Sequence, residues 1–222
     1  MIGASTGPTR TLSEFDSKNR LAAAGVPMGA ERLVSSPAEA IAAASEFGFP
    51  VVAKLCGDAI AHKTERGLVR LGLRDAAAVQ EAVEALLAAG RPEDGVRGVL
   101  VAPMVAGTRE LIAGMLVDPT FGRCVMLGIG GIFAEALADV AFRLVPLSRQ
   151  DAEDMIGDLE HQSWFDEFRG EPAVERDLLI DILLGLSRVA AENDEIVSID
   201  INPLIIADGR PVAVDALVEV QA

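Results

Sequence analysis

The chain reads Ser198-Ile199-Asp200-Ile201-Asn202-Pro203-Leu204 near its end and, after a short turn, Val212-Ala213-Val214-Asp215-Ala216. Side chains alternate faces along an extended strand, so Asp200 and Asn202 point the same way. The Asp208-Gly209 pair predicts a hairpin turn that brings Asp215 back beside them. Two carboxylates and an amide oxygen are hard ligands of the kind that Mg2+ takes. The alternative is a solvated hairpin with acidic edges, because Asp is common near turns.

The composition limits the class of protein. With 222 residues, the chain can form one large domain or two small lobes, and its formal net charge of −15 argues against nucleic acid and anionic membrane surfaces as partners. No run approaches the roughly 20 uncharged residues that span a bilayer, and residues 1–10 lack the apolar core of a signal peptide. Cys56 and Cys124 lie in apolar runs, which favours buried reduced thiols. We therefore expect a cytoplasmic protein.

Helix and strand signals alternate along the chain without strict strand–helix–strand order. Start and stop signals predict helices from the capping-box stretch Thr11–Glu14 to Gly25, from Ser36 to Gly48, and over 75–89, 148–159 and 174–189. Apolar runs predict strands over 49–56, 68–73, 99–105, 109–117 and 124–128, before the terminal hairpin. This pattern favours α+β architecture with antiparallel sheets.

Lysines are scarce, so each one is informative. Lys54 lies in a strand otherwise made of Val, Ala, Leu and Cys, where a cation is costly unless it meets an anion. It is either a phosphate-binding lysine or a lysine that extends to solvent from an edge strand. The loop 61–67 holds His62, Lys63 and Gly67 and could cradle phosphate oxygens, with His62 as a nucleophile. The alternative there is a charged hairpin tip.

Acidic residues mark two further places. Glu110 begins a predicted strand and is alone an ordinary edge charge. Glu135 and Asp139 are four residues apart and would share a helical face that Arg143 continues. A local set of salt bridges is the alternative interpretation of this second group.

In this order, the motifs resemble the ATP-grasp fold, and more closely the nucleotide-binding β subunit or domain of NDP-forming acyl-CoA synthetases, the acetate–CoA ligase (ADP-forming) family. Succinyl-CoA synthetase is a more distant relative. The resemblance runs from about Thr11 to the C-terminus. The matching stretches are 12–27, 48–54, 62–67, 109–112, 118–122, 130–147, 168–172 and 200–204.

The resemblance implies two lobes with largely antiparallel sheets that sandwich ATP or ADP. After a flexible N-terminus over 1–10, a small lobe would span about 27–104, and a large lobe about 11–26 plus 105–222. The residues implied at the nucleotide are Lys54, Lys63, Gly67, Ala102, Met104 and Glu110. Those implied at Mg2+ are Asp200, Asn202 and Asp215.

The resemblance also implies a reaction, in which acid, CoA and ATP give acyl-CoA, ADP and phosphate through an acyl phosphate and a phosphohistidine. The implied catalytic residues are His62, as a phosphoryl relay, and Glu135 and Asp139, which would orient the incoming phosphohistidine loop. The CoA site and the principal phosphohistidine belong to an α subunit, so a partner in an α2β2-type assembly is implied.

The sequence departs from the family pattern at two places. The hinge reads Val101-Ala102-Pro103-Met104 where the family usually has Gln-Glu-Met, and Pro103 has no N–H to offer an adenine edge. Leu68 follows Gly67 where a second glycine is usual. Two other functions stay open: an ATP-grasp carboxylate–amine ligase, which needs no phosphohistidine, and a nucleotide-sensing domain without catalysis.

Overall fold

The computed structural model describes residues 8–60, 63–131, 138–168 and 170–222. The chain divides into two compact units, which are described separately. Unit 1 holds the described residues within 1–10, 17–28 and 105–222, and unit 2 holds 11–16 and 29–104. Among the described residues, no helix has the length and apolar character needed to cross a membrane.

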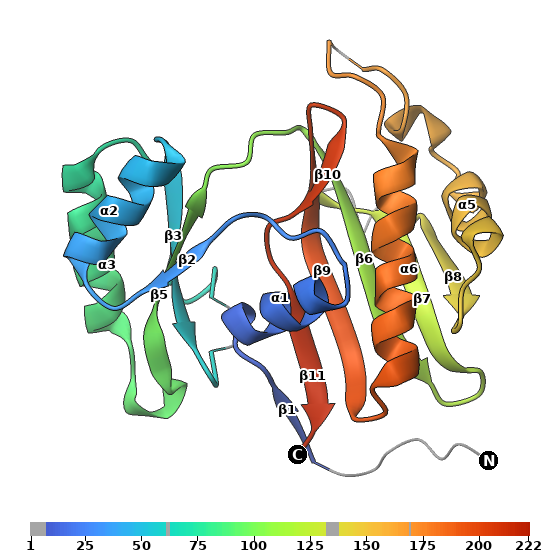
Figure 1. The fold of residues 1–222 in the computed structure, drawn as a ribbon, viewed down its shortest axis with the longest axis horizontal. Helices are drawn as coiled ribbons and strands as arrows, with labels where there is room; N and C mark the ends of the chain where they lie inside the picture. The colour runs from blue at the N-terminus through green and yellow to red at the C-terminus, as the bar shows by residue number, and fades with distance from the viewer. Residues whose placement is uncertain (1–7, 61–62, 132–137, 169) are drawn as a thin grey trace. The chain divides into compact units, whose positions relative to one another are not determined.

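Unit 2 is a four-stranded sheet with two helices on one face (Figure 1). Its strands run in the order β2-β5-β3-β4, and each described pair is antiparallel. The elements are β2 (Arg32–Val34), α2 (Pro37–Phe47), β3 (Val51–Gly57), β4 (Val69–Leu73), α3 (Ala76–Ala89), a short 3-10 helix (Pro92–Asp94) and β5 (Val96–Pro103).

Local signals explain where the two helices of unit 2 begin. Ser36 accepts a hydrogen bond from the Glu39 N–H ahead of Pro37, and Asp75 accepts one from the Ala78 N–H. Both predicted helices are confirmed. Alternate residues of β3, namely Val51, Ala53 and Leu55, enter the core with α2 and α3. Lys54 therefore lies on the opposite face of the strand.

Unit 1 is built on a seven-stranded sheet in the order β1-β11-β9-β6-β7-β8, with β10 also paired to β9. Figure 1 shows α6 lying across β6 and β7, with α5 beside it. The elements are β1 (Thr9–Thr11), α1 (Glu14–Ala23), β6 (Arg109–Asp118), β7 (Gly122–Ile129), β8 (Val140–Leu144), α5 (Arg149–Asp158), a 3-10 helix (Gln162–Trp164), α6 (Arg176–Glu192), β9 (Ile196–Ala207), β10 (Arg210–Ala213) and β11 (Leu217–Gln221). The last residue of β1 and residues 14–16 of α1 belong to unit 2.

The predicted α+β class with antiparallel sheets is confirmed, and three details differ. Helix α1 begins after Ser13, whose Oγ accepts from the Asp16 N–H, so the cap is two residues later than predicted. Thr9 and Arg10 belong to β1, whereas a flexible N-terminus was expected. Val140–Leu144 is a strand, so the helical face predicted to join Asp139 to Arg143 is wrong.

Candidate functional site

The acidic hairpin of unit 1 has the predicted form. Asp200 and Asn202 are exposed on β9, whereas Ile199 and Ile201, which alternate with them, are buried. The β6 register shifts between Ala113, opposite Ile201, and Leu111, opposite Leu204, so one extra residue forms a bulge at 202–203. The bulge returns Leu204 to the core while Asp200 and Asn202 keep a common outer face.

The chain returns towards Asp200 through the predicted hairpin turn. Asp208 and Gly209 both have positive φ, as a tight hairpin turn requires, and β10 then pairs with 204–207. The Val214 N–H donates to the Pro203 carbonyl (3.3 Å), and Leu217 lies opposite Asp200. Asp215 thus lies between the end of β10 and the start of β11, within electrostatic reach of Asp200.

The carboxylates of this hairpin influence each other. Desolvation by the surrounding protein, followed by repulsion from Asp215, raises the pKa of Asp200. The buried Lys18 ammonium holds the adjoining backbone by donating to the Val214 carbonyl (2.9 Å). No group of three or more His, Cys, Asp or Glu side chains suited to a metal occurs in the described part of the chain. A cation here would be held by two carboxylates, one amide oxygen and ligands from outside the chain, a donor set that suits Mg2+.

In unit 2, Lys54 and Lys63 meet at one carboxylate. Lys54 Nζ lies 2.8 Å from Glu14 Oε1, and Lys63 Nζ contacts Glu14 Oε2. The Glu14 side chain is 1% exposed, against 11% for Lys54 and 12% for Lys63. The sequence did not reveal this role of Glu14, because its spacing from Thr11 indicates only a helix cap.

The residues predicted around this pair are also placed. Gly67 has a φ of +66° and its N–H donates to the Thr64 carbonyl, which closes the turn after Lys63. Ala102 pairs with Val52 on β3, two residues from Lys54 and on the same face. The Met104 N–H donates to the Pro50 carbonyl (3.0 Å), so this hinge donor is already engaged within unit 2. Leu68, at the second departure from the family pattern, is a buried core residue.

Glu110 lies beside a glycine segment in unit 1. Its carbonyl accepts from the Gly130 N–H (2.8 Å), and its carboxylate is close to Gly131. The preceding residue, Arg109, is 2% exposed and donates to the carbonyls of Trp164, Asp166 and Pro172 and to the Glu171 carboxylate. Arg109 therefore anchors the segment 164–172 to β6.

Asp139 has a structural task that the sequence did not reveal. It is 6% exposed and accepts hydrogen bonds from the N–H groups of Glu160 and His161, both at 2.9 Å. His161 Nδ1 lies 2.8 Å from its Oδ2. Burial opposes ionisation, but these hydrogen bonds outweigh it and lower the pKa of Asp139. Glu135 and His62 lie outside the described residues.

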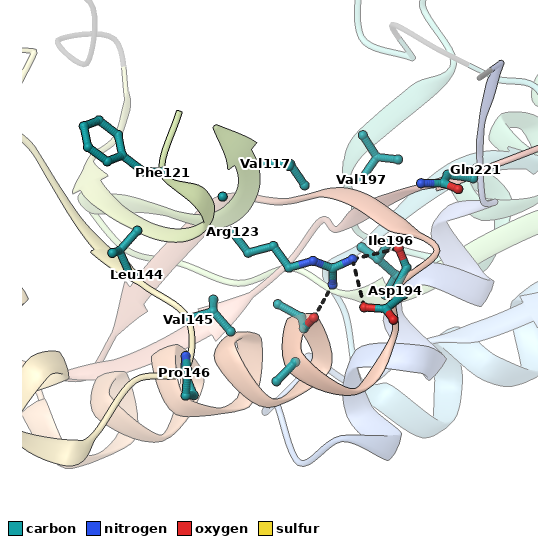
Figure 2. Close-up of a pocket in the computed structure, with 13 residues that line it drawn as sticks. Val117, Phe121, Arg123, Leu144, Val145, Pro146, Asp194, Ile196, Val197 and Gln221 are labelled. Atoms are coloured by element: carbon teal, nitrogen blue, oxygen red, sulfur yellow. Dashed lines mark hydrogen bonds and ion pairs between the residues drawn. The ribbon is translucent and has the colours of Figure 1, made fainter. Parts of the chain in front are cut away.

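A cavity of about 620 Å3 opens elsewhere in unit 1 (Figure 2). Its lining includes Phe121, Leu144 and Pro146 around Arg123, and it contains none of the predicted site residues. The Arg123 guanidinium already donates to the carbonyls of Ala190, Asn193 and Asp194.

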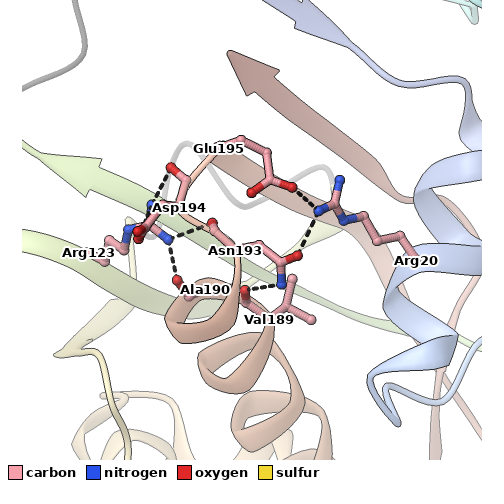
Figure 3. Close-up of polar contacts among 7 residues, drawn as sticks. All are labelled: Arg20, Arg123, Val189, Ala190, Asn193, Asp194 and Glu195. Carbon is pink, nitrogen blue, oxygen red and sulfur yellow. Dashed lines mark hydrogen bonds and ion pairs between the residues drawn. The ribbon is translucent and has the colours of Figure 1, made fainter.

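Figure 3 shows that Arg123 and Arg20 both bind the residues that follow α6. Arg20 donates to Asn193 Oδ1 (2.7 Å) and pairs with Glu195, while Asn193 Nδ2 donates to the Val189 carbonyl. Asn193 and Arg123 thus satisfy the Val189 and Ala190 carbonyls at the end of α6, whereas Arg20 binds side-chain oxygens. The cation of the cavity, Arg123, therefore caps α6.

Comparison with known proteins places this geometry in a family. An ATP-grasp domain family matches residues 3–220. The chain is 35% identical over 210 residues to the β subunit of acetate–CoA ligase (ADP-forming) I of Pyrococcus furiosus, covering 93% of this chain and 90% of that subunit. It is 34% identical to 4-hydroxybutyrate–CoA ligase (ADP-forming) of Nitrosopumilus maritimus. That alignment covers 89% of this chain but only 29% of the longer protein.

Solved structures agree. The acetyl-CoA synthetase 1 of Candidatus Korarchaeum cryptofilum with coenzyme A and Ca-AMPCP superposes with a TM-score of 0.88 at 36% identity, over 95% of this chain and 93% of that one. The same enzyme with Mg-AMPPCP, its phosphohistidine segment pointing towards the nucleotide-binding site, gives a TM-score of 0.81 at 35% identity, with the same coverage. The predicted resemblance is confirmed: this chain belongs to the ATP-grasp family, among the β subunits and β-type domains of ADP-forming acyl-CoA ligases.

Proposed function

We propose that this chain is the nucleotide-binding half of an acid–CoA ligase (ADP-forming), which moves a phosphoryl group between ATP or ADP and a phosphohistidine. The overall reaction converts acid, CoA and ATP to acyl-CoA, ADP and phosphate. The observation that carries the proposal is the convergence of the Lys54 and Lys63 ammonium groups on a carboxylate that is itself almost inaccessible to solvent. Their small remaining exposure leaves a cationic surface suited to phosphate oxygens.

Each predicted site residue has a role in this proposal. Lys54, Lys63 and the Gly67 turn would bind phosphates, Ala102 and Met104 would line the base, and Glu110 would contact the nucleotide. Asp200, Asn202 and Asp215 would hold Mg2+, which neutralises charge on the phosphates during transfer. His62 would accept the γ-phosphoryl group, with an N–P bond forming as the bond to the β,γ-bridging oxygen breaks and ADP leaves.

The structure constrains two of these roles. Because the Met104 N–H is engaged by Pro50, base recognition at the hinge would depend on other groups of Ala102 and Met104. Asp139 already accepts three hydrogen bonds from residues 160–161, so it would act on a phosphohistidine loop by fixing that segment. We call Asp139 a positioning residue for this reason.

The proposed partner is an α subunit that carries the CoA-binding and phosphohistidine domains, in an α2β2-type assembly. A relative named as a subunit and a longer single-chain relative both support the need for further domains. We also propose a cytoplasmic location, which the free, buried thiols of Cys56 and Cys124 support.

The test is reconstitution with the product of the neighbouring gene, followed by an acyl-CoA synthetase assay over short-chain and aryl acids. We expect ADP formation that requires acid and CoA, and acid-labile label on this chain after incubation with γ-labelled ATP. His62→Ala should remove that label. Unchanged turnover in His62→Ala would instead favour a carboxylate–amine ligase, and nucleotide binding without any turnover would favour a sensing domain.

A further inference from the structure

Glu14 occupies a position in unit 2 that is fixed from several sides. It is the first residue of α1, where a carboxylate is favoured by the helix dipole. The preceding Ser13 caps the helix and accepts from Arg97 (3.3 Å), and Arg97 also pairs with Asp16. These contacts hold the first turn of α1 against β5, independently of the lysines.

The two lysines that contact Glu14 lie in different structural elements, one in a strand and one in a loop. Lys54 is in the middle of β3, between β4 and β5. Lys63 is in a loop, and its carbonyl accepts from the Leu68 N–H (2.8 Å). Both ammonium groups contact oxygens of one carboxylate, so they lie only a few ångströms apart, where like charges repel. Glu14 offsets this repulsion.

We propose that Glu14 is a positioning residue that keeps Lys54 and Lys63 charged and side by side for the phosphate groups of a nucleotide. The inference rests on the proposed function, and it adds a residue that would act through the lysines without touching the ligand. The difference in exposure supports this division, since an anion from solvent can reach the ammonium groups but not the carboxylate. Together, the Glu14, Lys54 and Lys63 side chains carry two positive charges and one negative charge.

The other ionisable groups around the cluster must be controlled. Cys56 on β3 is buried and lies within electrostatic reach of both Glu14 and Lys63. Arg97 on β5 faces Asp16 and Asp58. The pH measurements therefore use a Cys56→Ala background, and they run from pH 8 to 10.5, above the range in which an ordinary imidazole titrates.

The experiment measures Mg-ADP affinity by calorimetry for the full chain and for Glu14→Gln, with Asp16→Asn as the matched control on the same helical turn. We expect about tenfold weaker binding in Glu14→Gln at pH 8, equivalent to about 1.4 kcal/mol. We also expect the alkaline loss of affinity to begin at least about one pH unit lower than in the parent, because removing the Glu14 carboxylate leaves the repulsion between the two ammonium groups less well offset. Asp16→Asn should match the parent in both.

A double-mutant cycle covers the case in which Glu14→Gln folds poorly. Glu14→Gln/Lys63→Met removes one negative and one positive charge together, so it leaves the net charge of the chain unchanged and should fold better than Glu14→Gln alone. Lys63→Met should weaken Mg-ADP binding strongly in the parent and at most about twofold in the Glu14→Gln background. Additive effects, or a pH profile unchanged by Glu14→Gln while Lys54→Met abolishes binding, would overturn the role of Glu14. Absence of Mg-ADP binding in the parent chain would overturn the proposed function itself.

Discussion

Two charged regions of the molecule differ in how their charges are paired: the lysine cluster of unit 2 (Glu14, Lys54 and Lys63) and the acidic hairpin of unit 1 (Asp200 to Asp215). In the cluster, Lys54 and Lys63 share the buried Glu14, so opposite charges meet within the protein. In the hairpin, Asp200 is exposed beside Asp215, and the like charge together with desolvation raises the pKa of Asp200. The lysine cluster is thus neutralised in part within the protein itself, whereas a bound cation would relieve the repulsion at the hairpin.

The largest effect should come from removing a carboxylate of the hairpin. Asp215→Asn should lower turnover of the reconstituted enzyme by about 100-fold, since phosphoryl transfer depends on a correctly held metal. Asp208→Asn is the matched control, because it removes a carboxylate from the turn of the same hairpin at a positive φ that Asn tolerates. Steady-state kinetics at saturating Mg2+ check this, and equal turnover of the two variants would show that the hairpin is only an acidic turn.

Arg109 is a buried cation whose contacts, unlike those that Lys54 and Lys63 make with Glu14, are with backbone carbonyls and Glu171, so its removal should affect stability. Arg109→Met should lower the free energy of unfolding by about 3 kcal/mol, because three carbonyls and Glu171 lose a buried charged donor. The measurement is urea unfolding, with the exposed Arg149→Met as control. A loss below about 1 kcal/mol would mean that the segment 164–172 is held by other contacts.

Asp94 in unit 2 should make the stability of the folded chain depend on pH. The hydrogen bond from Arg66 and then that from the Arg91 N–H lower its pKa to about 2. A lowered folded-state pKa contributes stability above the unfolded value, near 3.9, and this is lost as the pH falls through about 2. Thermal unfolding from pH 5 to 2 should therefore show a larger acid loss of stability in the parent than in Asp94→Asn. Parallel curves would contradict this role.

The stability linked to Asp200 should change with pH in the opposite direction to that linked to Asp94, and by the smallest amount. The folded-state pKa of Asp200 is raised, so the stability linked to it is present when it is protonated and is lost as the pH rises through that value. Asp200→Asn should thus stabilise the metal-free chain at pH 7, by less than about 1 kcal/mol because solvent screens an exposed charge. Added Mg2+ should raise the melting temperature of the parent more than that of Asp200→Asn, and an equal rise would argue against metal at this hairpin.

Features set by neighbouring residues could be predicted from the sequence. The cap at Ser36 and the turn at Asp208-Gly209 depend on contacts within a few residues, and both formed as expected. Strand alternation likewise placed Asp200 and Asn202 on one face of β9. The family motifs added the order of these elements, which composition alone could not.

Features that depend on distant contacts were missed. Glu14 meets Lys54 and Lys63 across 40 and 49 residues, so its cap-like position concealed its role as their counter-ion. The spacing of Asp139 and Arg143 suggested a helix, but residues four apart share a face in strands as well. The alternation of Val140 and Phe142 was the better indication of β8, and the hydrogen bonds of Asp139 to residues 160–161 had no local signal.

The central claim is that this chain binds a magnesium nucleotide without the proposed α subunit. Calorimetric titration of Mg-ADP and Mg-ATP into the parent chain, into Lys54→Met and into the parent with excess chelator tests it most directly. We predict saturable binding below millimolar nucleotide in the parent, with marked weakening by either the substitution or the chelator. No binding at millimolar nucleotide, or binding that neither change weakens, would contradict the claim.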